Sequence, residues 1–115
     1  MIYDKGIFMI STHILDTSLG HPAKDVNVEL ALHDGKEWKL LASENTNADG
    51  RIVFNTPFEK GTYRLKFKTE DYFLKNNQTA FFVVAPVVFN ITDTSRKYHI
   101  PLLLNPFGYS TYRGS

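Results

Sequence analysis

The segment VNVELALH (residues 26–33) alternates apolar and polar side chains, which is the two-residue period of a β-strand with one buried face. The dipeptide Asp34-Gly35 follows at once, and this pair is favoured in β-hairpin turns. We therefore expect residues 26–33 to form a strand whose chain turns back into a second strand over 34–46.

Similar short apolar segments, separated by turn residues, occupy much of the remaining chain. They are FMISTHILD (8–16), RIVFNT (51–56), TYRLKFKT (62–69), FFVVAPVVFNITD (81–93), RKYHIPLLL (96–104) and GYSTYR (108–113). Only TEDYFLKNNQ (69–78) resembles a helix, with Thr69 as its expected N-cap and asparagines at its end. Many short strands with regular turns predict an all-β fold, an antiparallel β-sandwich of seven or eight strands.

Length and composition limit the classes of protein to which the chain can belong. Its 115 residues suit one domain, and 43% apolar with 22% charged residues is ordinary for a soluble globular protein. Thirteen basic and twelve acidic residues give a net charge of +1, so neither nucleic acid nor a membrane surface is an expected partner. The chain has no cysteine, which excludes disulfides, thiolate metal sites and cysteine nucleophiles. No apolar run approaches the roughly 18 residues of a membrane span, and the start lacks an export signal, so we expect a cytoplasmic protein.

Three predicted strands carry a chemically active side chain on the face opposite to their core residues. His13 points outward if Ile10 and Ile14 lie in the core, and Arg51 points outward if Ile52 and Phe54 do. His99 points outward if the core residues of its strand are Tyr98, Ile100, Leu102 and Leu104. The same outer faces also carry Leu and Val, which suits an interface or a pocket wall better than plain solvent. A single strand histidine usually has a packing or surface role, and the sequence does not show that these strands are neighbours. A two-histidine metal site lacks a third ligand at suitable spacing, so no metal is expected.

Several motifs together resemble those of a known family. STHILD (11–16), GHPAKDV (20–26), TNADGR (46–51) and YHIPLLLNPFGYSTYRGS (98–115) are similar to the 5-hydroxyisourate hydrolases, the transthyretin-related enzymes of urate breakdown. The resemblance implies a single domain over residues 8–115 and leaves residues 1–7 as an N-terminal extension of unknown role. The closing tetrapeptide, residues 112–115, is typical of the enzyme branch and absent from transthyretin, the hormone carrier on the same fold. Asn105, Val83 and Lys97 depart from the family pattern, and none of them is a residue that the resemblance makes catalytic.

This resemblance implies a transthyretin-like sandwich of two four-stranded sheets with one short helix. It implies a homotetramer, built as a dimer of dimers, with active sites in clefts where the dimers meet. By the same resemblance His13, Arg51 and His99 are catalytic, and the terminal segment lines their cleft. The substrate-binding residues it implies are His13, Arg51, Tyr112, Arg113 and Ser115.

The implied reaction is hydrolysis of 5-hydroxyisourate to 2-oxo-4-hydroxy-4-carboxy-5-ureidoimidazoline, with no metal or organic cofactor. Our hypothesis is that His99 and His13 activate the water, while Arg51 holds the substrate oxygens and stabilises the developing negative charge. Which histidine is the base stays open. Two alternatives also stay open at this point: a transthyretin-like carrier that binds a small aromatic ligand in its inter-dimer channel, and a structural or interaction sandwich without chemistry.

Overall fold

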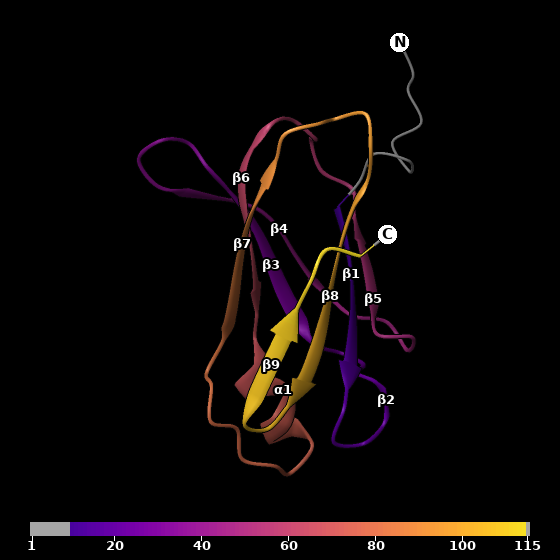
Figure 1. Ribbon diagram of the computed structural model, residues 1–115. Helices are drawn as coiled ribbons and strands as arrows, with labels where there is room; N and C mark the ends of the chain where they lie inside the picture. The colour runs from indigo at the N-terminus through magenta and orange to yellow at the C-terminus, as the bar shows by residue number, and fades with distance from the viewer. Residues whose placement is uncertain (1–9, 115) are drawn as a thin grey trace.

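Two β-sheets lie face to face, with one short helix at the end where β9 begins (Figure 1). The computed structural model describes residues 10–114, so the expected extension 1–7, the first residues of the expected domain and Ser115 lie outside the described part. The elements are β1 (Ile10–Asp16), β2 (His21–Pro22), β3 (Asn27–His33), β4 (Trp38–Asn45), β5 (Arg51–Phe54), β6 (Gly61–Phe67), α1 (Thr69–Lys75), β7 (Ala85–Ile91), β8 (Tyr98–Asn105) and β9 (Gly108–Thr111).

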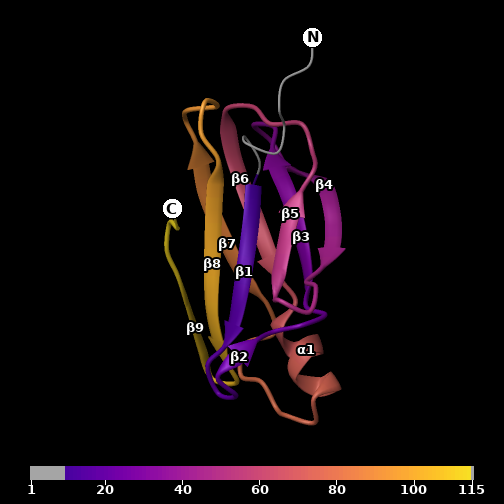
Figure 2. The ribbon, with the colours of Figure 1, turned by 90° about the vertical axis from the view of Figure 1, so that its right-hand side faces the viewer.

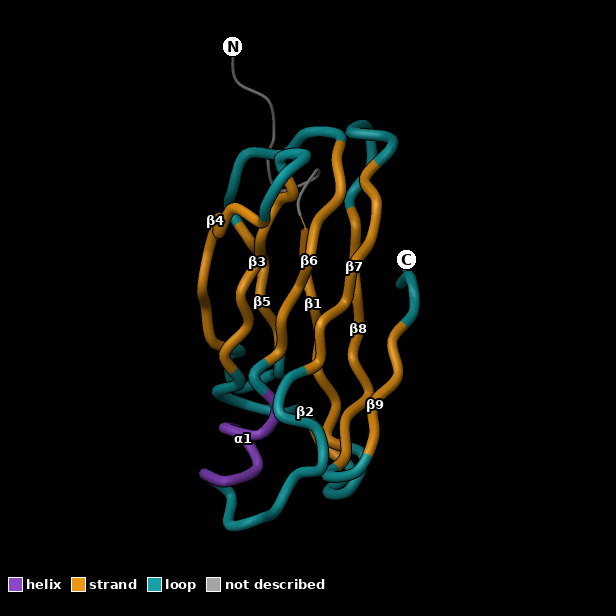
Figure 3. The backbone as a smooth tube through the Cα atoms, turned by 90° about the vertical axis from the view of Figure 1, so that its left-hand side faces the viewer, coloured by secondary structure: helices purple, strands orange, loops and turns teal. Residues whose placement is uncertain are grey.

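The first sheet has the order β2-β1-β8-β9. Both β2 and β5 pair with the edge of β1 away from β8: β2 pairs with the end of β1, and β5 pairs with its beginning. Figure 2 shows β8, β1 and β5 side by side in this sheet. The second sheet has the order β4-β3-β6-β7 and is wholly antiparallel (Figure 3). The predicted sandwich is confirmed, with two refinements: the first sheet gains the two-residue β2, and its central pair β1–β8 is parallel.

The core fills the space between the sheets with the apolar residues that the alternating pattern selects. In β1, β5 and β8 every expected core residue is buried, as are Val28 and Leu30 of β3 and Tyr63, Leu65 and Phe67 of β6; Leu32 of β3 is partly buried. The largest fully buried side chains of these strands are Tyr63, Phe54, Phe67, Ile10, Ile14, Leu30, Leu65, Leu102 and Leu104. Because each fully buried side chain of this size contributes about 1.5–3 kcal/mol, the alternation itself fixes which strand faces point outward.

The helix is shorter than expected, and Thr69 is not its N-cap. It spans Thr69–Lys75 rather than 69–78, and Lys68 occupies the cap position without a side-chain cap hydrogen bond. Thr69 is instead buried, and its hydroxyl donates to the carbonyl of Phe82 at 3.2 Å. This one helix in residues 10–114 is too short to cross a membrane.

The strand predicted over 81–93 begins only at Ala85. The preceding backbone is used elsewhere: the N–H of Phe81 donates to the carbonyl of Pro106, and the carbonyl of Val83 accepts from the N–H of Glu70. These groups are therefore not available to a sheet ladder. Pro86 is tolerated within β7 because this strand pairs only with β6 among the described residues, and a proline without an N–H suits an edge strand.

Asp16 is a buried anchor at the end of β1. Its Oδ1 accepts from the backbone and hydroxyl of Ser18, and its Oδ2 accepts from the Tyr72 hydroxyl at 2.7 Å. Burial by itself raises the pKa of Asp16, but these hydrogen bonds outweigh it and hold the pKa below its ordinary value. The carboxylate thus ties helix α1 to the first sheet.

Candidate active site

Strand register brings the three expected catalytic residues onto three adjacent strands. His13 on β1 lies directly opposite Arg51 on β5, and Ser11, two residues earlier on β1, lies directly opposite His99 on β8. Residues two apart on a strand share a face, so His13, Arg51 and His99 share the outer face of the first sheet. The neighbour relation that the sequence left open is therefore present in the fold.

Two rows of side chains cross this outer face. Val53, Ser11 and His99 form one row, and Arg51, His13 and Pro101 form the next. Directly opposed side chains in such rows lie about 5 Å apart at Cβ, and diagonal neighbours about 7–8 Å apart. A small planar molecule placed over β1 can consequently reach all three polar side chains at once.

The turn before β5 fixes the position of Arg51, the first residue of that strand. Gly50 has φ +73°, and a Cβ built there would come within 2.6 Å of the Ile14 carbonyl oxygen. The Gly50 carbonyl accepts from the Ile14 N–H at 2.8 Å, which ties the start of β5 to β1. The Asp49-Gly50 turn thus also sets the register that places Arg51 beside His13.

His99 is half-buried, with Ser11 beside the Nδ1 edge of its ring and Gly114 beside the Cδ2 edge. Its Nδ1 lies 2.8 Å from the Ser11 hydroxyl oxygen. Its backbone carbonyl accepts from the Gly114 N–H at 2.8 Å, in an isolated antiparallel bridge that brings the C-terminal segment alongside β8. A Cβ added to Gly114 would lie only 2.7 Å from His99 Cδ2, so the segment approaches the imidazole as closely as glycine allows.

The electrostatic surroundings keep His99 neutral. Burial is the largest cause that lowers its pKa, followed by electrostatic interactions with Arg51, His13 and Lys97. Since the ordinary pKa of histidine is already near 6.5, the lowered pKa leaves the ring unprotonated at neutral pH. A neutral imidazole beside a guanidinium combines a proton acceptor with a fixed positive charge.

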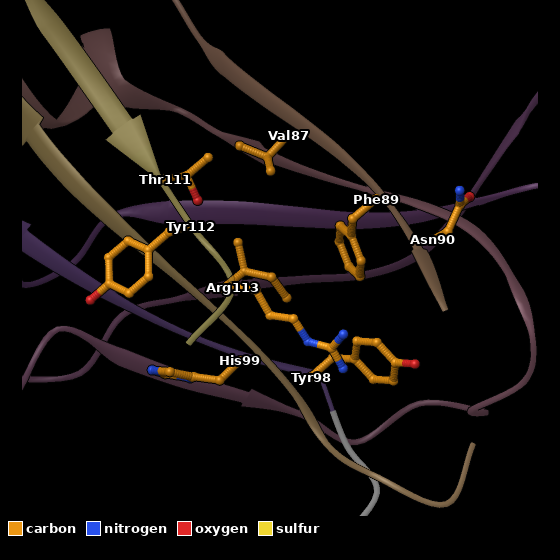
Figure 4. Close-up of a pocket in the computed structure, with 9 residues that line it drawn as sticks. Val87, Phe89, Asn90, Tyr98, His99, Thr111, Tyr112 and Arg113 are labelled. Atoms are coloured by element: carbon orange, nitrogen blue, oxygen red, sulfur yellow. The ribbon is translucent and has the colours of Figure 1, made fainter. Parts of the chain in front are cut away.

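Two hollows flank His99. One, of about 190 Å³, is lined by Ser11, Thr12, Arg51, Ile52, Val53, Lys97 and His99. The other, of about 230 Å³, is lined by Val87, Phe89, Asn90, Tyr98, His99, Ile100, Thr111, Tyr112 and Arg113 (Figure 4). His99 contributes to both, whereas Arg51 lines only the first and the C-terminal residues only the second.

Tyr112 and Arg113 line a hollow together with His99, but neither of them lines the hollow that contains Arg51. The Arg113 guanidinium carbon lies 4.6 Å from the centroid of the Tyr98 ring, a cation–π contact. Figure 4 shows Arg113 reaching toward Tyr98, while the His99 ring points the opposite way. Tyr112 is exposed, and Ser115 lies outside the described residues.

Sequence reasoning assigned no role to Ser11, although the alternation placed it on the correct face. The available signal was its position two residues before His13, which puts both side chains on one side of β1. Residues 10–114 contain no cluster of three or more His, Cys, Asp or Glu side chains arranged to hold a metal ion.

Comparison with known proteins places this chain in a family. Residues 10–114 match the model of the HIUase/Transthyretin family. The chain belongs to this family. Among HIUase/transthyretin relatives, the 5-hydroxyisourate hydrolase of Halalkalibacterium halodurans is 46% identical over 115 residues, covering 92% of this chain and 97% of that protein. The 5-hydroxyisourate hydrolase 2 of Rhizobium meliloti is 42% identical, covering 92% of this chain and 95% of its own length.

Solved structures of the HIUase/transthyretin family agree with the fold. The 5-hydroxyisourate hydrolase of Klebsiella pneumoniae matches with a TM-score of 0.83 and 41% identity, covering 93% of this chain and 99% of that one. Sea bream transthyretin in complex with thyroxine matches with a TM-score of 0.85 and 33% identity, covering 91% of this chain and 93% of that one. The backbone thus resembles both branches of the family, while the sequence is more similar to the hydrolases.

Proposed function

We propose that the protein is a 5-hydroxyisourate hydrolase that forms 2-oxo-4-hydroxy-4-carboxy-5-ureidoimidazoline in urate degradation. Relatives that bear this enzyme name, at 40–46% identity over nearly the whole chain, support the assignment. The single observation that carries it is the placement of His13, Arg51 and His99 on adjacent strands of one outer face. Transthyretin structures match at only 32–33% identity, so the carrier alternative has less support.

The reaction opens a cyclic amide, and its steps assign a task to each of the three residues. Water attacks the carbonyl carbon of the six-membered ring while His99, with His13 beside it, takes the water proton. Arg51 donates hydrogen bonds to the carbonyl oxygen as it becomes an oxyanion. The carbon–nitrogen bond then breaks, the leaving nitrogen receives the proton from the imidazolium, and a carboxyl group remains on the product. Neutral His99 suits the first step, because a base must be unprotonated to act.

The C-terminal residues are assigned to substrate binding in the same proposal. The bridge between Gly114 and His99 holds this segment along β8, next to the proposed base. Tyr112 and Arg113 line the hollow that shares His99, and the tyrosine ring offers an apolar face to a planar substrate. With His13, Arg51 and Ser115 they make up the proposed set of substrate-binding residues.

The proposed assembly is a homotetramer, a dimer of dimers, that covers this face. In the single chain the site lies open, and Val53 in the row beside Ser11 and His99 is 57% exposed. Within residues 10–114, β7 and β9 each pair on one side only, which leaves backbone groups available for another copy. Light scattering after gel filtration tests this, and a strict monomer would contradict it. The cytoplasmic location stays a prediction, which cell fractionation would test.

A direct assay tests the proposed activity. Urate oxidase generates 5-hydroxyisourate from urate in the cuvette, and the ultraviolet absorbance of the intermediate then decays spontaneously. Added protein is expected to accelerate this decay in proportion to its concentration, and a boiled sample serves as the control. If the decay keeps its spontaneous rate at every protein concentration, the proposal is wrong.

A further inference from the structure

The contact between Ser11 and His99 joins two strands that are far apart in the sequence. The parallel β1–β8 register places the two residues directly opposite each other on the outer face. The next residue on β1, Thr12, points the other way, and its hydroxyl donates to the Ile100 carbonyl at 2.6 Å in the core. The Ser11 hydroxyl, by contrast, has the His99 ring as its partner, at 2.8 Å from Nδ1.

The ring has only one nitrogen left for chemistry once this contact is made. Nδ1 faces Ser11, and Cδ2 faces Gly114, where an added Cβ would lie 2.7 Å away. Nε2 lies between Cε1 and Cδ2 at the tip of the imidazole, farthest from the backbone. In a neutral imidazole one nitrogen carries the proton and the other the lone pair, and the hydrogen bond of one nitrogen sets the state of the other.

The charges around the ring favour one of the two tautomers. Arg51 on β5, His13 on β1 and Lys97 before β8 act on His99, while Arg113 from the C-terminal segment is held over Tyr98. Arg51 and Lys97 line the same hollow as His99. A lone pair at the exposed tip is attracted by these positive groups, whereas an N–H there would be repelled by them.

We propose that Ser11 is a positioning residue whose hydroxyl oxygen accepts a hydrogen bond from the Nδ1–H of His99 and so leaves the lone pair on Nε2, facing the substrate. This inference rests on the proposed function and deepens it, because it names His99 Nε2 as the base. When Nε2 takes the water proton, Nδ1 keeps its own, and its hydrogen bond to Ser11 becomes charge-assisted and stronger. Serine therefore supports the base both before and after proton transfer without donating a proton itself.

Replacing Ser11 by alanine tests this in two independent ways. Nitrogen NMR of protein labelled with ¹⁵N-histidine reports which ring nitrogen of His99 is protonated, and it needs no substrate. The decay assay gives kcat/KM against pH. Ser11→Thr keeps a hydroxyl at the position, and Ser43→Ala on β4 of the other sheet is the matched control.

In wild type we expect the Nδ1–H form of neutral His99. Ser11→Ala should mix the two tautomers and lower kcat/KM about tenfold, the order of effect of one orienting hydrogen bond. It should also shift the acid limb of the pH profile to lower pH, because the imidazolium loses an acceptor. Ser11→Thr should restore the tautomer and much of the activity, and Ser43→Ala should match wild type.

Each other result overturns a defined part of the argument. Predominance of the Nε2–H form in wild type would overturn the role of Ser11, even if the enzyme is active. So would a Ser11→Ala protein with wild-type kcat/KM and an unchanged pH profile. A wild-type protein with the expected tautomer but no hydrolysis would overturn the proposed function instead, and with it the role of Ser11 in catalysis.

Discussion

Gly114 and His99 form a backbone bridge in which the Gly114 N–H donates to the His99 carbonyl at 2.8 Å. The same contact leaves no room for a side chain, because a Cβ on Gly114 would lie 2.7 Å from His99 Cδ2 and 3.1 Å from Pro101 Cγ. The position of the C-terminal segment and the position of the imidazole are therefore coupled.

Gly114→Ala should accordingly lower activity more than stability. The added methyl group must push the imidazole or the C-terminal segment aside, and we expect kcat/KM to fall about tenfold or more, since small misplacements of a catalytic group are costly. Gly108→Ala is the matched control, because a Cβ there meets nothing closer than 4.0 Å. Urea unfolding should give nearly equal stabilities for both variants. Wild-type kcat/KM in Gly114→Ala would show that the segment does not position His99.

Arg51→Lys keeps the positive charge but removes the planar fork of donors. If Arg51 stabilises the oxyanion through directed hydrogen bonds, kcat should fall about 10²-fold, the effect typical of losing one such donor. Arg96→Lys, on the exposed turn before β8, is the control and should retain wild-type turnover. Equal turnover in Arg51→Lys and wild type would mean that charge alone is needed, which contradicts the proposed role.

The lowered pKa of His99 predicts a pH dependence of stability. The unfolded chain takes up a proton near pH 6.5, where the folded protein resists doing so, so stability should be complete above this pH and fall as the pH drops below it. His99→Gln should remove this part of the acid sensitivity. Urea unfolding of both proteins at about pH 7.5 and 5.5 measures the difference. A wild-type protein that loses no more stability than His99→Gln would refute the lowered pKa.

Tyr72→Phe tests the anchor at the end of β1. Removing the hydroxyl leaves Asp16 Oδ2 buried without this partner, which should cost about 1–3 kcal/mol of unfolding free energy. The low pKa of Asp16 contributes stability above its ordinary value, near 3.8, that is lost as the pH falls, so the variant should also be less sensitive to acid in that range. Tyr109→Phe, which keeps the ring that packs on Phe82, should change stability by less than about 0.5 kcal/mol. Equal unfolding free energies for the two variants would contradict the anchor.

Period-two alternation predicted the faces of the site strands correctly. Ile10, Ile14, Ile52 and Phe54 had to be buried, so His13 and Arg51 had to point outward. The sequence could not show that β1 lies between β5 and β8, because that order depends on pairings between distant segments. The β1–β8 pairing is parallel, so no hairpin turn in the sequence predicts it. For the same reason Ser11 could not be assigned to His99, from which 88 positions separate it.

The errors at residues 69–84 have a common physical cause. Local sequence signals predicted Thr69 as a helix N-cap and residues 81–84 as a strand. In the structure, the polar groups of Thr69 and Phe81 instead form hydrogen bonds to distant parts of the chain. Thr69 is buried and bonded to Phe82, and the Phe81 N–H bonds to the β8–β9 turn at Pro106. Local propensity yields where a buried polar group has a better partner elsewhere.

The central claim is that His99 on this outer face is the base of the hydrolysis. Its most direct test is the decay of enzymatically generated 5-hydroxyisourate with wild type, His99→Ala and the control His33→Ala, whose histidine lies on β3 of the other sheet. All three proteins should remain folded by circular dichroism. We predict that wild type and His33→Ala accelerate the decay equally and that His99→Ala is at least about 100-fold slower, the lower bound for loss of a positioned base. A folded His99→Ala protein with near-wild-type turnover would contradict the claim.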